Sequence, residues 1–405
     1  LSLSCSMLDA WMGTVPAANR TTTMTLNATH AIDSTSPSQG NPPDTGFELG
    51  WDYAHYAVVP PTEHLHPLSP VRQGWEAGRE CFGRRTLLAH RFARKWLQLR
   101  LNAWLRGRAF DGAQVNPAFL RQIDVALCPV TREVLTHGTG EPTDASIDRV
   151  FNDAGYAAGN LAVMSTRANH AKNSYGAEDA MRFVRQIELG QLGEIDGMSA
   201  EQWSRIAVLT SFCTPMPHAK AATLPLLVLP PSRLRVLNPV QALQVMLSLQ
   251  FTRAGHARRC AALAALVPSA DARYAFNAFM HTLLARRLAA GRFADNTAER
   301  HAVEDLWRDP LVNQRWQRLA LRLTADDCDR IARQAAGKGL AGAGVRWLPT
   351  DSATEGWALE SGGYDVAAPQ STATAIWPPR TCAPVRTAMP LAHSSQPRAV
   401  DRSHA

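Results

Sequence analysis

Residues 145–172 contain two short strand-like segments, a loop and a helix start, and this order constrains the fold more than any other part of the chain. Residues 145–150 alternate small or apolar with polar side chains, which is typical of a half-buried strand. The following nine residues are rich in Asn, Asp and Gly, which favour turns, and Leu161–Met164 is a second apolar run. Ser165 or Thr166 then supplies a helix N-cap. We therefore expect a strand–loop–strand–helix unit.

This unit resembles the HNH, or ββα-metal, nuclease superfamily. The family has Asp-His on its first strand, Asn-Leu at the start of its second strand, and an Asn-x-x-Lys or His-containing turn where its helix begins. In this chain Asp148 and Arg149 stand at the Asp-His position, and Asn160 is followed by Leu as in the family. Asn169 and Lys172 match the Asn-x-x-Lys turn. The Asp-Arg pair is similar to that of a variant branch of the superfamily.

The resemblance covers residues 128–172 and implies a role for each matching residue. Asp148 and Asn169 would ligate one divalent ion, Mg²⁺ or Mn²⁺, because oxygen donors suit hard cations. Asn160 would tie the loop to the hairpin, and Lys172 would hold a phosphate. The implied activity is metal-dependent endonuclease cleavage of phosphodiester bonds, in which the metal stabilises charge on the scissile phosphate.

Arg149 departs from the family, in which a His at this position activates water. A guanidinium stays protonated and cannot take up a proton, although it can clamp a phosphate. His137, His170 and Tyr156 are the nearby candidates for the missing base, so we predict His137, Arg149 and His170 as catalytic residues. The alternative is a non-catalytic nucleic-acid-binding protein that retains a degenerate HNH fold. A third hypothesis is a helical scaffold in which the hairpin is only a fold element.

Positive charge is concentrated just upstream of this unit. The formal net charge is +7, and residues 71–108 hold ten basic residues against two acidic ones, so the rest of the chain is close to neutral. Apolar residues recur there at helical spacing, which predicts an amphipathic basic helix over about residues 78–106. Such a helix would bind nucleic acid, most simply DNA, without reading its sequence. A solvated face of a core helix and a membrane-surface helix are the alternatives. The predicted phosphate-binding residues are Arg84, Arg85, Arg91, Arg94 and Lys95.

The remaining sequence predicts a mainly α protein with this small ββα element embedded in it. Helix starts are expected after Ser199, Asn238, Asp309 and Thr324, and a helix break near Gly176. The expected regions are a disordered segment (1–45), a basic helical region (46–127), the HNH-like element (128–190), an α-helical domain (191–345) and a low-complexity, disordered tail (346–405).

Cysteine usage and hydropathy predict the compartment. The seven cysteines are scattered and no Cys-x-x-Cys occurs, so we expect no structural zinc. Free thiols suit a reducing cytosol, and no signal peptide or membrane-spanning stretch is expected. These observations favour a cytoplasmic, bacterial-type protein with a nucleic-acid partner and no membrane partner, and they leave its oligomeric state undetermined.

Overall fold

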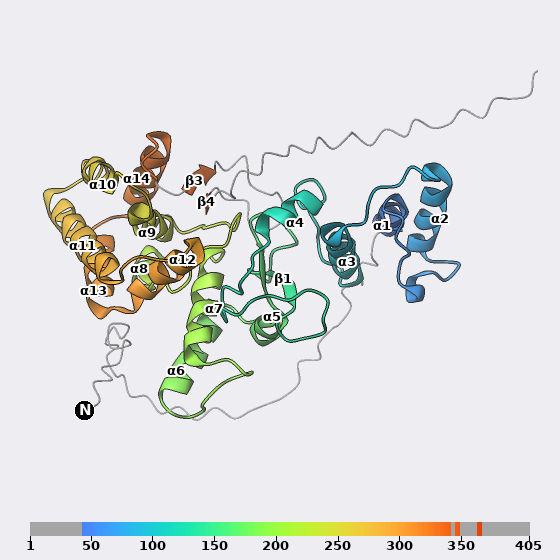
Figure 1. Cartoon of the computed structure of the whole chain (residues 1–405), viewed down its shortest axis with the longest axis horizontal. Coiled ribbons are helices and arrows are strands. Elements are labelled where there is room, and N and C mark those ends of the chain that lie inside the picture. The colour runs from blue at the N-terminus through green and yellow to red at the C-terminus, as the bar shows by residue number, and fades with distance from the viewer. Residues whose placement is uncertain (1–42, 342–344, 349–362, 367–405) are drawn as a thin grey trace, which may run out of the picture. The chain divides into compact units, whose positions relative to one another are not determined.

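A computed structural model describes residues 43–341, 345–348 and 363–366, and these residues form a mainly helical protein (Figure 1). The predicted mainly α class is therefore confirmed for them. The segments predicted to be disordered, 1–45 and 346–405, lie largely outside the described residues. Inside the second of them, strand β4 (Gly363–Val366) pairs antiparallel with β3 (Val345–Leu348), which the prediction of an unstructured tail missed.

The first part of the chain is a set of closely packed helices. Backbones of the first two approach so closely that a Cβ at Gly50 would lie 1.9 Å from the carbonyl oxygen of Val71, and one at Gly74 would lie 1.9 Å from that of Phe47. Only glycine fits both positions, so the sequence fixes this crossing point. The helices are α1 (Pro43–His55), α2 (Pro70–Phe82), α3 (Arg91–Leu105) and α4 (Pro117–Ile123), with a 3₁₀ turn, η2 (Thr62–His64).

The basic helix predicted over residues 78–106 is wrong in its bounds, because two helices cover this region. Gly83 ends α2 with a positive φ of 51°, and His90 begins α3 by accepting a hydrogen bond from the backbone N–H of Ala93. The inner face of α3 is apolar except for Arg100, which is buried and ion-paired with Asp52 of α1. One of the ten basic residues is therefore part of the core and does not face solvent.

The predicted strand–loop–strand–helix unit is present as β1 (Ala145–Arg149), β2 (Leu161–Ser165) and α5 (Thr166–Lys172). The strands pair antiparallel, with Ile147 opposite Val163. Ser165 ends β2 and caps α5, since its hydroxyl accepts a hydrogen bond from the N–H of Ala168 at 3.2 Å. The chain breaks after α5 and resumes as α6 (Ala177–Glu188), as the sequence predicts.

Local capping signals set the starts of the later helices. The starts predicted after Ser199, Asn238, Asp309 and Thr324 are all confirmed, and Thr324 closes a reciprocal capping box with Asp327. These helices are α7 (Ala200–Phe212), α8 (His218–Thr223), α9 (Pro239–Ser248), α10 (His256–Ala264), α11 (Ala270–Ala289), α12 (Asn296–Asp305), α13 (Pro310–Ala320) and α14 (Ala325–Gly337), with 3₁₀ turns η3 (Leu249–Thr252) and η4 (Leu306–Arg308).

One apolar core runs from α1 through the hairpin to α14 and crosses the predicted boundary at residue 190. Ion pairs and hydrogen bonds also join the parts of the chain on either side of this boundary. Arg132, in the turn before β1, donates to both carboxylate oxygens of Asp305 at 2.8 and 2.9 Å and to Glu304 at 3.1 Å. Arg205 of α7 donates to the carbonyl of Val130 in the same turn at 3.0 Å. The hairpin unit is thus joined to α12 and α7.

Candidate functional site

The loop between β1 and β2 is held by one buried amide. The side-chain oxygen of Asn160 accepts a hydrogen bond from the N–H of Phe151 at 2.8 Å. Its amide nitrogen donates to the carbonyl oxygens of Phe151 and Gly155 at 3.0 and 3.1 Å. Since Asn160 is fully buried, these three bonds satisfy the group and fix the path of the loop. Asn160 therefore has a structural position.

Asp148 is buried against Lys172. Side chains alternate along β1, so Ser146 and Asp148 face α5. The Lys172 ammonium is fully buried and lies 3.0 Å from a carboxylate oxygen of Asp148. It also donates to the carbonyl of Arg149 at 3.0 Å and to Asn152 at 3.3 Å. Burial raises the pKa of Asp148, and the Lys172 charge opposes this effect.

The buried ion pair of Asp148 with Lys172 differs from the roles that the sequence predicts for these two residues. A lysine ammonium lies where the prediction places a divalent cation, and it already compensates the carboxylate charge. Lys172 was also predicted to hold a phosphate, but a fully buried ammonium has no access to one. Asn169 likewise uses its amide to donate to Ser146 at 2.7 Å. Asp148 and Asn169 thus lie at one β1–α5 interface, where each already has a protein partner.

The three residues predicted to be catalytic are not gathered around Asp148. Arg149 points to the other side of β1 and donates to the carbonyls of Asn152 and Ala154 at 2.8 and 2.9 Å. It therefore closes the loop and does not project toward a phosphate. His170 lies exposed on α5, whereas His137 is exposed on a separate loop. The predicted base His137 and the predicted metal ligand Asp148 lie on opposite sides of β1.

The loop that carries His137 is built around Asp144, a residue that the sequence reasoning missed. Its carboxylate accepts hydrogen bonds from the hydroxyl of Thr136 at 2.7 Å, from the N–H of Thr139 at 3.1 Å and from the N–H of Gly140 at 2.8 Å. These donors hold the pKa of Asp144 well below its ordinary value. The signal was present in the sequence, because a Gly-x-Gly stretch near an Asp favours turns closed by a carboxylate.

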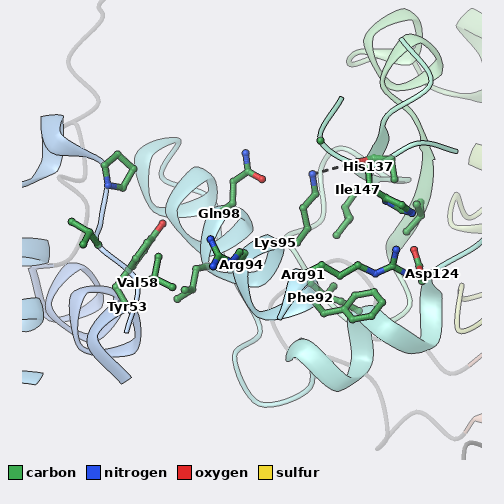
Figure 2. Close-up of a pocket in the computed structure, with 17 residues that line it drawn as sticks. Tyr53, Val58, Arg91, Phe92, Arg94, Lys95, Gln98, Asp124, His137 and Ile147 are labelled. Carbon is green, nitrogen blue, oxygen red and sulfur yellow. Dashed lines mark hydrogen bonds and ion pairs between the residues drawn. The ribbon is translucent and has the colours of Figure 1, made fainter. Parts of the chain in front are cut away.

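His137 stands at the edge of a cleft whose volume is about 550 Å³ (Figure 2). Figure 2 shows α3 between His137 and Ile147 on one side and Tyr53 and Val58 on the other, and all four residues line the cleft. Arg91, Arg94, Lys95 and Gln98 recur at helical spacing, so they form one face of α3 and line the cleft together. The structure thus brings His137 together with three of the predicted phosphate-binding residues, although they are far apart in the sequence.

All three of these cations have contacts within the protein, and Arg94 donates to the carbonyl of Ala89 at 3.0 Å. Arg91 forms an ion pair with Asp124, which follows α4. Lys95 donates a long hydrogen bond of 3.4 Å to the carbonyl of Ala145 on β1, as Figure 2 shows. Burial lowers the pKa of Lys95, and the nearby Asp144 carboxylate opposes this effect.

Arg84 and Arg85 lie outside the cleft. Both are exposed in the loop between α2 and α3, and neither is among the residues that line the cleft. In the chain they precede the first residue of α3, Arg91. The predicted set of cations therefore divides into a pair on this loop, a group on the cleft and Lys172 in the core.

Within residues 43–341 and the two short strands, no group of three or more His, Cys, Asp or Glu side chains is placed to hold a metal ion. In the same residues no helix combines the length and the apolar character needed to cross a bilayer. Comparison of the chain with models of protein families, with curated proteins and with solved structures gives no match, so its geometry is the guide to its function.

Proposed function

We propose that this chain is a nucleic-acid-binding protein that holds a phosphate backbone along the outer face of α3. The observation that carries the proposal is the shared face of Arg91, Arg94 and Lys95 at a cleft that His137 also lines. Cationic side chains spaced along one helix neutralise successive phosphates and release bound counterions. Arg84 and Arg85, exposed in the loop that precedes α3, would supply further cations.

We further propose that residues 128–190 are an HNH-type ββα element that serves this binding as a support. The strand–strand–helix order and the Asn160 bonds agree with such an element. The ion pair between Asp148 and Lys172 favours a binding protein over a nuclease, because a buried ammonium takes the position of the catalytic cation. In this proposal the Lys172 ammonium is the permanent counterion of the buried Asp148 carboxylate.

DNA in the cytoplasm is the proposed setting. Within the described residues Cys128, Cys213, Cys260 and Cys328 are free thiols, which agrees with a reducing compartment. Cations that contact the phosphate backbone predict affinity with little sequence preference.

A salt titration tests the proposed function. A fluorescein-labelled oligonucleotide is titrated with the protein at several salt concentrations, and the anisotropy gives each dissociation constant. Arg94→Gln should weaken binding and reduce the slope of log K against log salt by about 0.9, because one phosphate contact is lost. Arg318→Gln is the matched control, since Arg318 is also exposed but lies on α13. Absence of binding at low salt, or equal losses in both variants, would contradict the proposal.

A metal-dependent phosphodiesterase is the second candidate function. It is favoured by the common position of Asp148 and Asn169 at the β1–α5 interface, and it requires Lys172 to move aside for Mg²⁺ or Mn²⁺. Supercoiled plasmid is incubated with the protein and either metal, beside Asp148→Ala. The binding proposal expects no nicking by either protein. Metal-dependent nicking that Asp148→Ala abolishes would establish the nuclease instead.

A further inference from the structure

The cleft beside α3 has an apolar floor and a cationic rim. Leu97, Leu120 and Val163 are core residues whose side chains form part of its lining, and the half-buried Ile147 joins them. Arg91, Arg94 and Gln98 of α3 and His137, which Figure 2 labels, are exposed, so these lining side chains lie nearer the solvent than the apolar ones. A surface that only contacts a passing phosphate backbone has no need of such a recessed apolar floor.

The size of the cleft limits what enters it. Its volume of about 550 Å³ lies within the range of pockets that enclose a small ligand, roughly 300–1,000 Å³. A paired base in a duplex stays inside the stack and reaches a recessed pocket only after it has been unpaired and turned outward. An unpaired base of a single strand or a bulge needs no such step, and it presents an apolar face.

We propose that the cleft takes one unpaired base of a nucleic-acid strand, with the flanking phosphates on Arg94, Lys95 and His137. This inference rests on the proposed function and names its substrate class, a single strand or a strand with an unpaired nucleotide. The base lies against Ile147 and the floor, and it replaces water there. The adjacent phosphates remain at the rim, where the cations stand.

Lys95 is placed to connect the two parts of this site. Its side chain is half-buried, and its ammonium donates to Ala145 O at 3.4 Å, on the strand that carries Ile147. An ammonium has three donors, and this long bond uses one of them. A phosphate next to the inserted base would accept from the same ammonium, so base insertion and phosphate binding would take place side by side.

A fluorescent base tests the inference. An oligonucleotide with 2-aminopurine in its centre is prepared as a single strand, as a paired duplex and as a duplex in which 2-aminopurine is bulged. The single strand and the bulge should bind about tenfold more tightly than the paired duplex, a ratio in the range of one base contact. The 2-aminopurine emission of both should rise several-fold, because insertion separates the base from its stacked neighbours.

Two variants and their controls locate the signal. Ile147→Trp should obstruct the apolar part of the cleft and remove the rise in emission, while Val134→Trp, at an exposed position outside the cleft, should leave it unchanged. Gln98→Glu adds a negative charge at an exposed position on the rim and should weaken single-strand binding about tenfold, whereas Gln73→Glu on α2 should not. If Ile147→Trp does not fold, the comparison of Gln98→Glu with Gln73→Glu still tests the inference.

The outcomes separate this inference from the proposed function. If paired duplex binds as tightly as single strand and the emission stays constant, the cleft does not take a base, and the proposed function stands. The same conclusion follows if Gln98→Glu and Gln73→Glu weaken binding equally. If no form of the oligonucleotide binds at low salt, both the inference and the proposed function fail.

Discussion

Replacing Lys172 by methionine should destabilise the protein by about 4 kcal/mol at neutral pH, because the carboxylate of Asp148 would remain buried without its counterion. The Lys172 ammonium also donates to the carbonyl of Arg149 and to Asn152. Methionine fills most of the volume and removes all of these bonds. For a folded unit of this size, about 4 kcal/mol lowers Tm by about 6 °C.

The loss of stability caused by Lys172→Met should increase as the pH rises. In the folded protein burial raises the pKa of Asp148, and Lys172 opposes the rise, so Lys172→Met should raise this pKa further. A carboxyl group whose folded-state pKa is raised contributes stability below its unfolded pKa, about 3.9, and this contribution is lost as the pH rises through the folded pKa. The stability difference between wild type and Lys172→Met should therefore be small in acid and grow toward neutrality.

Urea unfolding followed by circular dichroism, at pH values from 4 to about 8, measures this difference. The double variant Asp148→Leu/Lys172→Met removes both charges, so it should lose less than Lys172→Met alone. A loss of less than about 1 kcal/mol in Lys172→Met at neutral pH would refute the argument. So would single losses that simply add in the double variant, since the two side chains would then be independent.

Three further outcomes test other parts of the structure. Asn160→Ala removes three buried hydrogen bonds and should cost about 2–3 kcal/mol in urea unfolding; a loss below about 0.5 kcal/mol would contradict the bonding described. Arg132→Met removes the closer of two arginines paired with the buried Glu304, which keeps Arg300 at 3.5 Å, and should cost about 2 kcal/mol even in high salt, whereas a loss that vanishes with salt would indicate a surface pair. Brief alkylation at pH 8, read by peptide mass spectrometry, should label exposed Cys81 and spare Cys213, whose pKa burial raises to about 12; equal labelling would be inconsistent with that burial.

The parts of the fold that the sequence predicts correctly are those set by neighbours in the chain. Ser199 and Thr324 cap helices through residues three positions later, and the alternation before Val150 depends only on adjacent side chains. The extent of the basic helix was wrong because Gly83 and His90 divide it into two helices, whereas the burial of one of its cations depends on a distant contact. Arg100 enters the core through Asp52, which lies 48 residues earlier, and no local pattern reveals that pair.

The candidate site was predictable to a similar degree. The spacing of Asn169 and Lys172 places both on the face of α5 that meets β1, and the structure has them there. Whether an acid at this position holds a metal or an ammonium depends on how deeply Lys172 is buried, which sequence spacing does not encode. The cleft itself required His137 to meet α3, a contact between segments more than thirty residues apart.

The contact of Arg132 with α12 bears on whether this protein can be cut into independently folding fragments. The small strand–strand–helix unit resembles an independently folding fragment, since its hairpin and helix are contiguous in the chain. Its preceding turn, however, depends on Asp305 and on Arg205 for its ionic and hydrogen-bonding partners. A fragment cut out at residues 128–190 would lose those partners and expose apolar surface that the later helices cover. The strand–strand–helix unit and the downstream helices therefore form one folding unit. A transfer of the hairpin into another protein would have to include α7 and α12.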